Sequence, residues 1–394
     1  MRLAIFTPFI YPFHVDMLMA LCNKVETKLF TCGIYGNYPF EGLLRHAEVL
    51  KCINLAGFKV AKPLGLAKFL RYRPNAVIIF GIEGLTGLAI YMISRLVRAK
   101  TLVVVEENNI NLLDNPILNL LQKFKRQVVR LVYKHASVLV AESHASKKYV
   151  LEILHVKRNR PIIVRVHGID TERYLKFASM PKTRARILIS KILKLSEDLL
   201  TKQWCTFIGE PSYCKGADVL LDAIEILQEA PEIVAKAIFL FPKMELLRDR
   251  GDLKECYEQK LKRLVSSGLV ILYNPIKPDH MPIFYRASDI IVLPSRFMTY
   301  SSSDRSPNVA LEALASGNIL VASYVGGIPT IVGDATVLVR PNDPYALANK
   351  LRDVLINEEK YEHLKEKARE RAMCELDVRC YVRDLLCYLK LSET

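Results

Sequence analysis

Short apolar runs alternate with stretches of helical periodicity from the beginning of the chain. In the first half, six of these runs predict strands, at residues 3–7, 28–32, 77–80, 102–105, 137–141 and 162–166. A stretch with helical spacing, residues 16–24, follows the first of them. Alternation of short strands with helices is typical of a doubly wound parallel sheet.

The same alternation begins again in the second half. We expect further strands at residues 205–208, 237–241, 270–273, 290–293 and 319–322, and helices at 217–227, 255–265, 281–287 and from 345 to the end. Between the halves, a stretch rich in Lys, Leu and Ile predicts a basic amphipathic helix at 184–200. This helix has two open roles: packing between domains with a solvated Lys/Arg face, or contact with a membrane surface. Two Rossmann-like halves with a cleft between them are the simplest α/β architecture.

Residues 289–332 combine a strand, a polar loop, a helix and a second strand. The loop carries Asp304, the helix has Pro307 in its first turn, and Gly317 follows its end. A right-handed βαβ unit results, whose loops lie at the carboxyl ends of the strands, where open α/β sheets bind ligands. Asp304 in the loop and Glu312 in the helix are carboxylates that can accept hydrogen bonds from one hydroxyl-rich ligand.

Composition limits the class of partner. The chain has 394 residues, enough for two domains, and is 51% hydrophobic and 25% charged, as in globular proteins. Its formal net charge of +15 favours anionic partners such as nucleotides, anionic lipid surfaces or nucleic acid. A basic surface without a specific partner is the alternative. The positive charge is spread along the chain rather than gathered with aromatic residues, so we expect no nucleic-acid partner.

Cysteine usage and the N-terminus indicate the compartment. Nine cysteines occur without a C-x-x-C pair or a Cys/His cluster at zinc spacing, so we expect neither a disulfide framework nor a metal site. The first residues lack the long apolar core of a signal peptide. Residues 76–97 are interrupted by Glu83 and Arg95 and favour a strand that leads into a helix rather than a membrane span. We therefore expect a cytoplasmic protein, soluble or peripheral on the inner face of the membrane.

Several motifs, in one order along most of the chain, resemble the retaining family 4 glycosyltransferases (glycosyl transferases group 1), which have the GT-B fold. They are HGID (167–170), FIGEPSYCKGADVLLDAIEIL, YRASDIIVLPS, SDRSPNVALEALASG and VGGIPTIVGDATVLVRPNDPYALANKL. The resemblance implies two Rossmann-like domains with parallel sheets that face each other across a cleft. Residues 1–178 would form the acceptor-side domain, with the C-terminal helix 378–394 packed back on it, and residues 179–377 the nucleotide-sugar-binding domain.

The resemblance also implies a reaction and its residues. A sugar would pass from a nucleotide-diphosphate donor, the co-substrate, to a glycan or lipid-linked acceptor, without a metal or another cofactor. The implied catalytic residues are Lys215 at the donor diphosphate, Glu312 at the ribose hydroxyls and Asp304, in place of the family's first Glu, at the transferred sugar. Donor contacts by backbone or close approach would come from Gly209, Gly216, Asn308, Val309, Gly326 and Gly327. The two glycines at 326 and 327 are also compatible with a plain tight turn.

The sequence departs from the family pattern at both domains. Glu210 stands where the family has an arginine on the diphosphate, and Arg296 or Arg305 is the candidate substitute. Thr330 replaces a glutamate. These departures keep a second hypothesis open, a catalytically degenerate GT-B protein that acts as a binding or partner module.

In the first domain, the acceptor-side residues also differ from the family. His14 lies in place of a Gly-Gly turn, and the family's histidine is replaced by an acidic stretch that includes Glu106 and Glu107. We predict His14, Glu106 and Glu107 as acceptor contacts. For His14, capping of the helix at Asp16 is the alternative.

Overall fold

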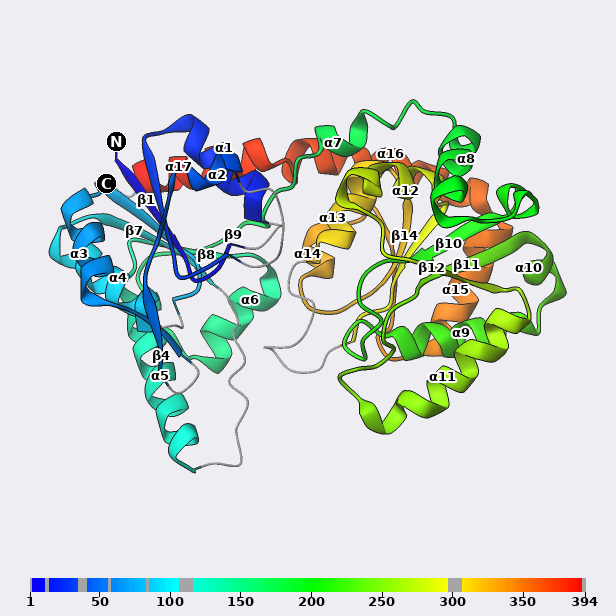
Figure 1. The fold of residues 1–394 in the computed structure, drawn as a ribbon, viewed down its shortest axis with the longest axis horizontal. Coiled ribbons are helices and arrows are strands. Elements are labelled where there is room, and N and C mark those ends of the chain that lie inside the picture. Colours follow the sequence, from blue (N-terminus) through cyan, green and yellow to red (C-terminus); the bar gives the residue numbers. More distant parts are fainter. Residues whose placement is uncertain are drawn as a thin grey trace. The chain divides into compact units, whose positions relative to one another are not determined.

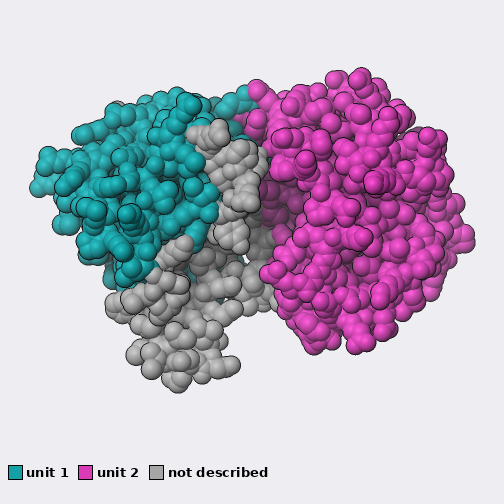
Figure 2. All heavy atoms as spheres, viewed as in Figure 1, with its two compact units in different colours: residues 1–169, 378–394 teal, residues 170–377 magenta. Residues whose placement is uncertain are grey.

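The structure is a computed structural model that describes residues 2–10, 14–34, 41–55, 58–82, 85–105, 116–296 and 307–391. The chain forms two compact units, shown in two colours in Figure 2. Unit 1 is Met1–Ile169 with Val378–Thr394, and unit 2 is Asp170–Asp377. The boundary therefore lies ahead of the predicted 178/179, because α7 (Glu172–Leu175) packs in unit 2, where the ring of Tyr174 meets that of Tyr285 edge-on.

Unit 1 contains a seven-stranded parallel sheet in the order β3-β2-β1-β6-β7-β8-β9. Its strands are β1 (Leu3–Thr7), β2 (Thr27–Thr31), β3 (Ala47–Val49), β6 (Ala76–Ile79), β7 (Lys100–Val105), β8 (Val138–Ala141) and β9 (Ile162–Val164). A separate antiparallel hairpin, which the sequence pattern did not predict, joins β4 (Cys52–Leu55) to β5 (Phe58–Ala61). The helices are α1 (Val15–Lys24), α2 (Glu41–Leu44), α3 (Pro63–Tyr72), α4 (Leu85–Leu96), α5 (Pro116–His135), α6 (His144–Lys148) and α17 (Val378–Leu391), with a π-helical turn at Tyr149–Ile153. Within the described residues, no helix has the length and apolar content needed to cross a membrane.

The last helix of the chain belongs to the core of unit 1. Alternate side chains of the sheet, such as Leu3 and Ile5 of β1, face α1 and α17 in one apolar cluster. In α17, buried apolar residues recur at helical spacing, at Val378, Tyr381, Val382, Leu385 and Leu389. Burial of such side chains contributes roughly 1.5–3 kcal/mol each, so α17 is an integral part of unit 1.

Unit 2 contains a six-stranded parallel sheet in the order β12-β11-β10-β13-β14-β15. Its strands are β10 (Gln203–Phe207), β11 (Ala237–Pro242), β12 (Val270–Tyr273), β13 (Ile290–Leu293), β14 (Ile319–Ser323) and β15 (Val337–Val339). The helices, besides α7, are α8 (Lys182–Leu193), α9 (Ala217–Gln228), α10 (Pro231–Lys236), α11 (Gly251–Ser266), α12 (Met281–Ala287), α13 (Asn308–Ser316), α14 (Ile328–Val332), α15 (Pro344–Ile356) and α16 (Glu358–Glu375). α9, α11 and α15 cover one face of the sheet, and α8, α12 and α13 lie on the other (Figure 1). The predicted βαβ unit is β13-α13-β14, with its strands paired in parallel.

The basic helix predicted at 184–200 is shorter than expected. α8 ends at Leu193, Lys194 takes a left-handed backbone conformation with φ of 57°, and a 3-10 turn follows at Glu197–Thr201. Tertiary hydrogen bonds explain the stop: the Trp204 indole donates to the Leu199 carbonyl at 2.8 Å, and Arg186 Nη1 donates to the Leu200 carbonyl at 2.8 Å. These bonds hold the chain after Lys194 in a conformation that a continued helix excludes.

Candidate functional site

The carboxyl ends of β10, β13 and β14 lie together at one edge of the sheet in unit 2. The chain leaves β10 towards β11 and β12 on one side, and towards β13, β14 and β15 on the other. Such a reversal of strand order between neighbouring parallel strands opens a crevice for ligands outside their carboxyl ends. The segments that follow β10, β13 and β14 carry most of the residues predicted for the donor.

The segment between β10 and α9 is tied closely to the end of β13. Gly216 has φ of 71°, and a Cβ added there would lie 1.9 Å from the carbonyl oxygen of Pro294, so only glycine fits. Asp249 accepts hydrogen bonds from the backbone amides of Tyr213 at 2.9 Å and Cys214 at 3.3 Å. The backbone of Lys215 is therefore fixed beside the carboxyl end of β13, while Gly209, with φ of 114°, begins the same segment.

A buried cation, Arg296, lies beside this segment. Its backbone amide donates to the Cys214 carbonyl at 3.0 Å, and its Nη2 donates to Asp218 Oδ2 at 2.9 Å. The guanidinium lies over the Tyr213 ring at 3.7 Å, and the Arg296 and Asp218 side chains are each only 6% exposed. Burial raises the pKa of Asp218, which the charge of Arg296 opposes. Arg296 Nε and Nη1 are buried and have no hydrogen-bond partner in the described part of the chain.

Glu312 projects from the second turn of α13. Leu311 and Leu314 on either side of it are buried in the core, whereas Glu312 is half-buried. Its Oε2 accepts a hydrogen bond of 2.7 Å from the hydroxyl of Tyr285, a fully buried residue of α12. Burial raises the pKa of the Tyr285 hydroxyl well above its usual value, and the Glu312 carboxylate adds to the shift. Glu312 thus has a protein partner that the sequence argument did not include, and its role at a ribose stays a prediction.

The remaining predicted donor contacts fall at the same edge of the sheet. Asn308 and Val309 are the first residues of α13, where backbone amides have no partner within the helix and the helix dipole favours negative charge. Gly326 has φ of 59°, which favours glycine, whereas Gly327 has φ of −87° and precedes α14 in ordinary helical conformation. Asp304 and Arg305 lie outside the described residues.

Glu210 and Thr330, the two residues of unit 2 that keep the non-catalytic hypothesis open, lie in different surroundings. Glu210 is exposed, and its backbone carbonyl accepts from the amide of Ser212 at 2.8 Å. Thr330 lies in α14, and its carbonyl accepts from Arg371 Nη2 at 2.9 Å. Because the Glu210 carboxylate faces solvent, salt and water screen its repulsion towards a phosphate.

In unit 1, His14, Glu142 and His167 come together from the segments that follow β1, β8 and β9. His167 Nδ1 lies 3.6 Å from Glu142 Oε1. Burial lowers the pKa of His14 to about 4, an effect that Glu142 opposes and His167 increases. His14 therefore carries no charge at neutral pH. His14 is the N-cap residue of α1, and its side chain makes no capping hydrogen bond to that helix.

Glu106 and Glu107 lie outside the described residues. Across the ranges that are described, no group of three His, Cys, Asp or Glu side chains is arranged to hold a metal ion.

Sequence reasoning missed the residues that support the site. Tyr285, Asp218 and Asp249 were not assigned a role, although each holds a predicted donor residue or its neighbour in place. A signal existed for Tyr285, because its hydroxyl lies in an otherwise apolar helix, MPIFYRA, and must find a partner when buried. The choice of Glu312 as that partner depends on the tertiary structure.

Part of unit 2 matches a known sequence family. Residues 196–371 match the family described as Glycosyl transferases group 1. The D-inositol 3-phosphate glycosyltransferase of Streptomyces avermitilis is 30% identical over 206 residues, which cover 51% of this chain and 41% of that protein. The enzyme of the same name from Corynebacterium aurimucosum is 26% identical over 260 residues, 65% of this chain and 56% of that protein. The chain thus spans about half the length of these curated relatives.

Comparison with solved structures covers both units. A glycosyltransferase from Rickettsia africae has a TM-score of 0.74 at 15% identity, over 99% of this chain and 98% of that chain. Anabaena Alr3699/HepE in complex with UDP also has a TM-score of 0.74, at 17% identity, over 99% of this chain and 100% of that chain. WaaG, a glycosyltransferase involved in lipopolysaccharide biosynthesis, has a TM-score of 0.65 at 13% identity, over 99% of each. The chain therefore has the GT-B fold, and its residues 196–371 match the Glycosyl transferases group 1 family.

Proposed function

We propose that this protein transfers a sugar from a nucleotide-diphosphate donor to a glycan or lipid-linked acceptor, with retention of the anomeric configuration and without a metal. The observation that carries the proposal is the placement of Lys215, Arg296 and Glu312 on the segments that follow the neighbouring strands β10 and β13, within residues 196–371 that match Glycosyl transferases group 1. UDP bound to the structurally similar Anabaena protein supports a nucleotide ligand. The non-catalytic alternative, which rested on Glu210 and Thr330, is not favoured by these matches.

The donor diphosphate would be bound by fixed positive charge. The Lys215 ammonium extends from a segment that Asp249 and Gly216 hold against β13. Arg296 is bonded through its backbone amide to Cys214 in the same segment, and two of its buried donors have no partner among the described residues; the amino end of α13 would add its dipole. Groups shielded from bulk water attract phosphate more strongly than groups at an open surface.

The nucleoside would be fixed by Glu312. A carboxylate accepts bonds from two neighbouring hydroxyls, as ribose offers, and the Tyr285 hydroxyl holds one oxygen of Glu312 in place. Asp304 is proposed to bind the transferred sugar. His14, uncharged at neutral pH, would accept a hydrogen bond from the acceptor in unit 1, and Glu106 and Glu107 are further proposed acceptor contacts.

Rate would come from positioning and electrostatic stabilisation. In the proposed step, the acceptor oxygen forms a bond to the anomeric carbon while the bond from that carbon to the diphosphate breaks. The acceptor proton passes to the departing phosphate oxygen on the same face of the sugar. Lys215, Arg296 and the amides of α13 stabilise the negative charge that develops on the diphosphate.

A screen of nucleotide sugars with the full chain, read by mass spectrometry for hydrolysis or transfer, tests the proposal. We expect release of one nucleoside diphosphate by the wild type, and loss of that release in Lys215→Ala and Glu312→Ala. Lys262→Ala and Glu255→Ala, which change exposed residues of α11, are matched controls and retain it. Release by the two site variants at the wild-type rate would overturn the assignment.

A further inference from the structure

α8 displays apolar side chains to solvent and buries polar side chains beside apolar ones. Ile187, Leu188 and Ile192 are 44%, 37% and 44% exposed. On the opposite side of the same helix, Arg186 and Ser190 are buried together with Ala185 and Ile189. α8 thus has apolar side chains on both sides, whereas a surface helix usually exposes a polar one.

Specific bonds fix this rotation of the helix. Arg186 forms an ion pair with buried Asp289, donates to the Ala287 carbonyl at 3.2 Å and lies over the Trp204 ring at 5.4 Å. Lys182 pairs with the other oxygen of Asp289. To bury Ile187 and Ile192, the helix would have to roll and leave the Asp289 carboxylate without these partners, which is strongly unfavourable.

The exposed residues form one continuous band, which we name the α8 outer face: Arg184, Ile187, Leu188, Lys191 and Ile192. At 100° per residue, these five positions span roughly 140° of the helix circumference. α8 contains no acidic residue, and Lys194 adds an exposed cation at its end. Arg184, Lys191 and Lys194 form no ion pair with any residue that the structure describes.

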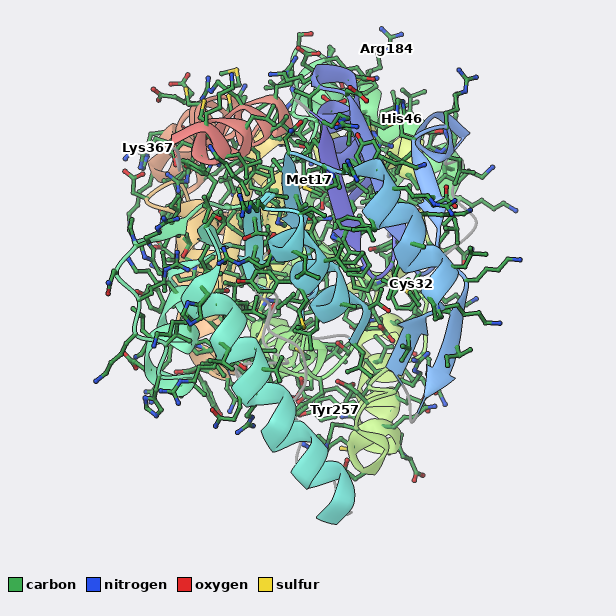
Figure 3. All side chains as sticks on the ribbon, turned by 90° about the vertical axis from the view of Figure 1, so that its left-hand side faces the viewer. Met17, Cys32, His46, Arg184, Tyr257 and Lys367 are labelled. Carbon is green, nitrogen blue, oxygen red and sulfur yellow. The ribbon has the colours of Figure 1, made fainter. Side chains whose placement is uncertain are left out.

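The outer face lies at the margin of unit 2. α8 runs along the outside of the α12 layer (Figure 1), and Arg184 extends away from the ribbon in Figure 3. The nearest acidic residues along the chain, Glu197 and Asp198, are in the 3-10 turn that follows and are themselves exposed. They lie outside the outer face and reduce its positive charge only in part.

We propose that the α8 outer face docks unit 2 on an anionic phospholipid surface. Aliphatic side chains enter the boundary between headgroups and acyl chains, while neighbouring cations bind lipid phosphates. Lysine is depleted in protein interfaces and the outer face has no aromatic anchor, so its composition favours lipid over an acidic protein. The net charge of +15 adds a general attraction to such a surface. This inference does not depend on the proposed sugar transfer.

Vesicle flotation with the full chain tests the docking. Vesicles of phosphatidylcholine alone are compared with vesicles of phosphatidylcholine and phosphatidylglycerol at 7:3, at low and high salt. We expect binding to the anionic vesicles that weakens with salt. The variant Arg184→Gln/Lys191→Gln/Lys194→Gln should bind at least tenfold more weakly, since each cation near an anionic surface contributes roughly fivefold. The variant Ile187→Ser/Leu188→Ser/Ile192→Ser should also lose binding.

The control variant Lys51→Gln/Lys157→Gln/Lys262→Gln removes the same number of positive charges from exposed positions outside α8. Because these positions affect binding only through the net charge of the protein, the control should bind within about threefold of the wild type. Circular dichroism confirms that each variant is folded. The proposal is overturned if the wild type does not bind anionic vesicles, or if the control loses as much binding as the α8 variants. Unchanged binding by both α8 variants, or binding to immobilised polyglutamate without binding to vesicles, would overturn it as well.

Discussion

The hydroxyl of Tyr285 offers the sharpest test of how the donor site is held. Tyr285→Phe keeps the ring, which is fully buried and packs against Tyr174, and removes only the hydroxyl that donates to Glu312 at 2.7 Å. A hydrogen bond to a charged group contributes roughly 1.5–3 kcal/mol net. We therefore expect the free energy of unfolding to fall by about 2 kcal/mol.

Binding should weaken as well, because Glu312 loses the contact that orients it. If half of the free energy of the Tyr285–Glu312 hydrogen bond serves to orient the carboxylate, its loss weakens nucleotide binding by about 1 kcal/mol. This corresponds to a rise of roughly fivefold in the Kd of the nucleoside diphosphate. Calorimetric titration with the nucleoside diphosphate that the wild type binds, chosen from UDP, GDP and ADP, measures this change.

Tyr257→Phe is the matched control. The Tyr257 hydroxyl, on α11, donates to Asp222 Oδ2 at 3.0 Å, away from the crevice; Tyr257 is labelled in Figure 3. This variant should lose stability and keep its affinity for the nucleotide. The reasoning is refuted if Tyr285→Phe binds as tightly as the wild type, or if both variants lose affinity equally.

Three further predictions concern stability. His14 has a pKa of about 4 in the folded chain and 6.5 in the unfolded chain, so the unfolded state takes up the proton first as pH falls. The resulting loss of stability is roughly 2 kcal/mol at pH 5 relative to pH 7.5, and urea unfolding should show it in the wild type but not in His14→Gln. Leu385→Ala should lower the free energy of unfolding by about 2–5 kcal/mol, because Leu385 is fully buried; an unchanged value would place α17 outside the core. Arg296→Gln leaves the buried Asp218 unpaired and should cost about 3–5 kcal/mol in thermal unfolding, most of which Arg296→Gln/Asp218→Asn restores.

Local sequence pattern was sufficient for most elements of the two sheets. The strands predicted at 270–273 and 290–293 and the helix at 281–287 coincide with β12, β13 and α12. Each is a continuous apolar or periodic run that ends at a polar or proline residue, so its limits are set locally. β3 and β15, of three residues each, were not predicted, although the equally short β9 was, at 162–166.

The end of α8 and two side-chain pairs of unit 2 depend on contacts between residues that are distant in the sequence. α8 stops at Leu193 because the carbonyls of Leu199 and Leu200, which follow the helix, accept hydrogen bonds from Trp204 and Arg186. The Tyr285–Glu312 bond joins residues 27 positions apart, and the Arg296–Asp218 pair joins residues 78 apart. A single sequence does not show which distant residues are in contact. The residues that bind the donor could therefore be predicted, whereas the residues that hold them in place could not.

A crystal structure of the full chain with its nucleoside diphosphate tests the central claim most directly. The account predicts ribose hydroxyls at roughly 2.5–3.0 Å from the Glu312 carboxylate and diphosphate oxygens at about 2.7–3.0 Å from Lys215 Nζ, at the carboxyl ends of β10 and β13. A nucleotide bound at another place, with Glu312 in contact with Tyr285 alone and Lys215 without phosphate, would contradict it.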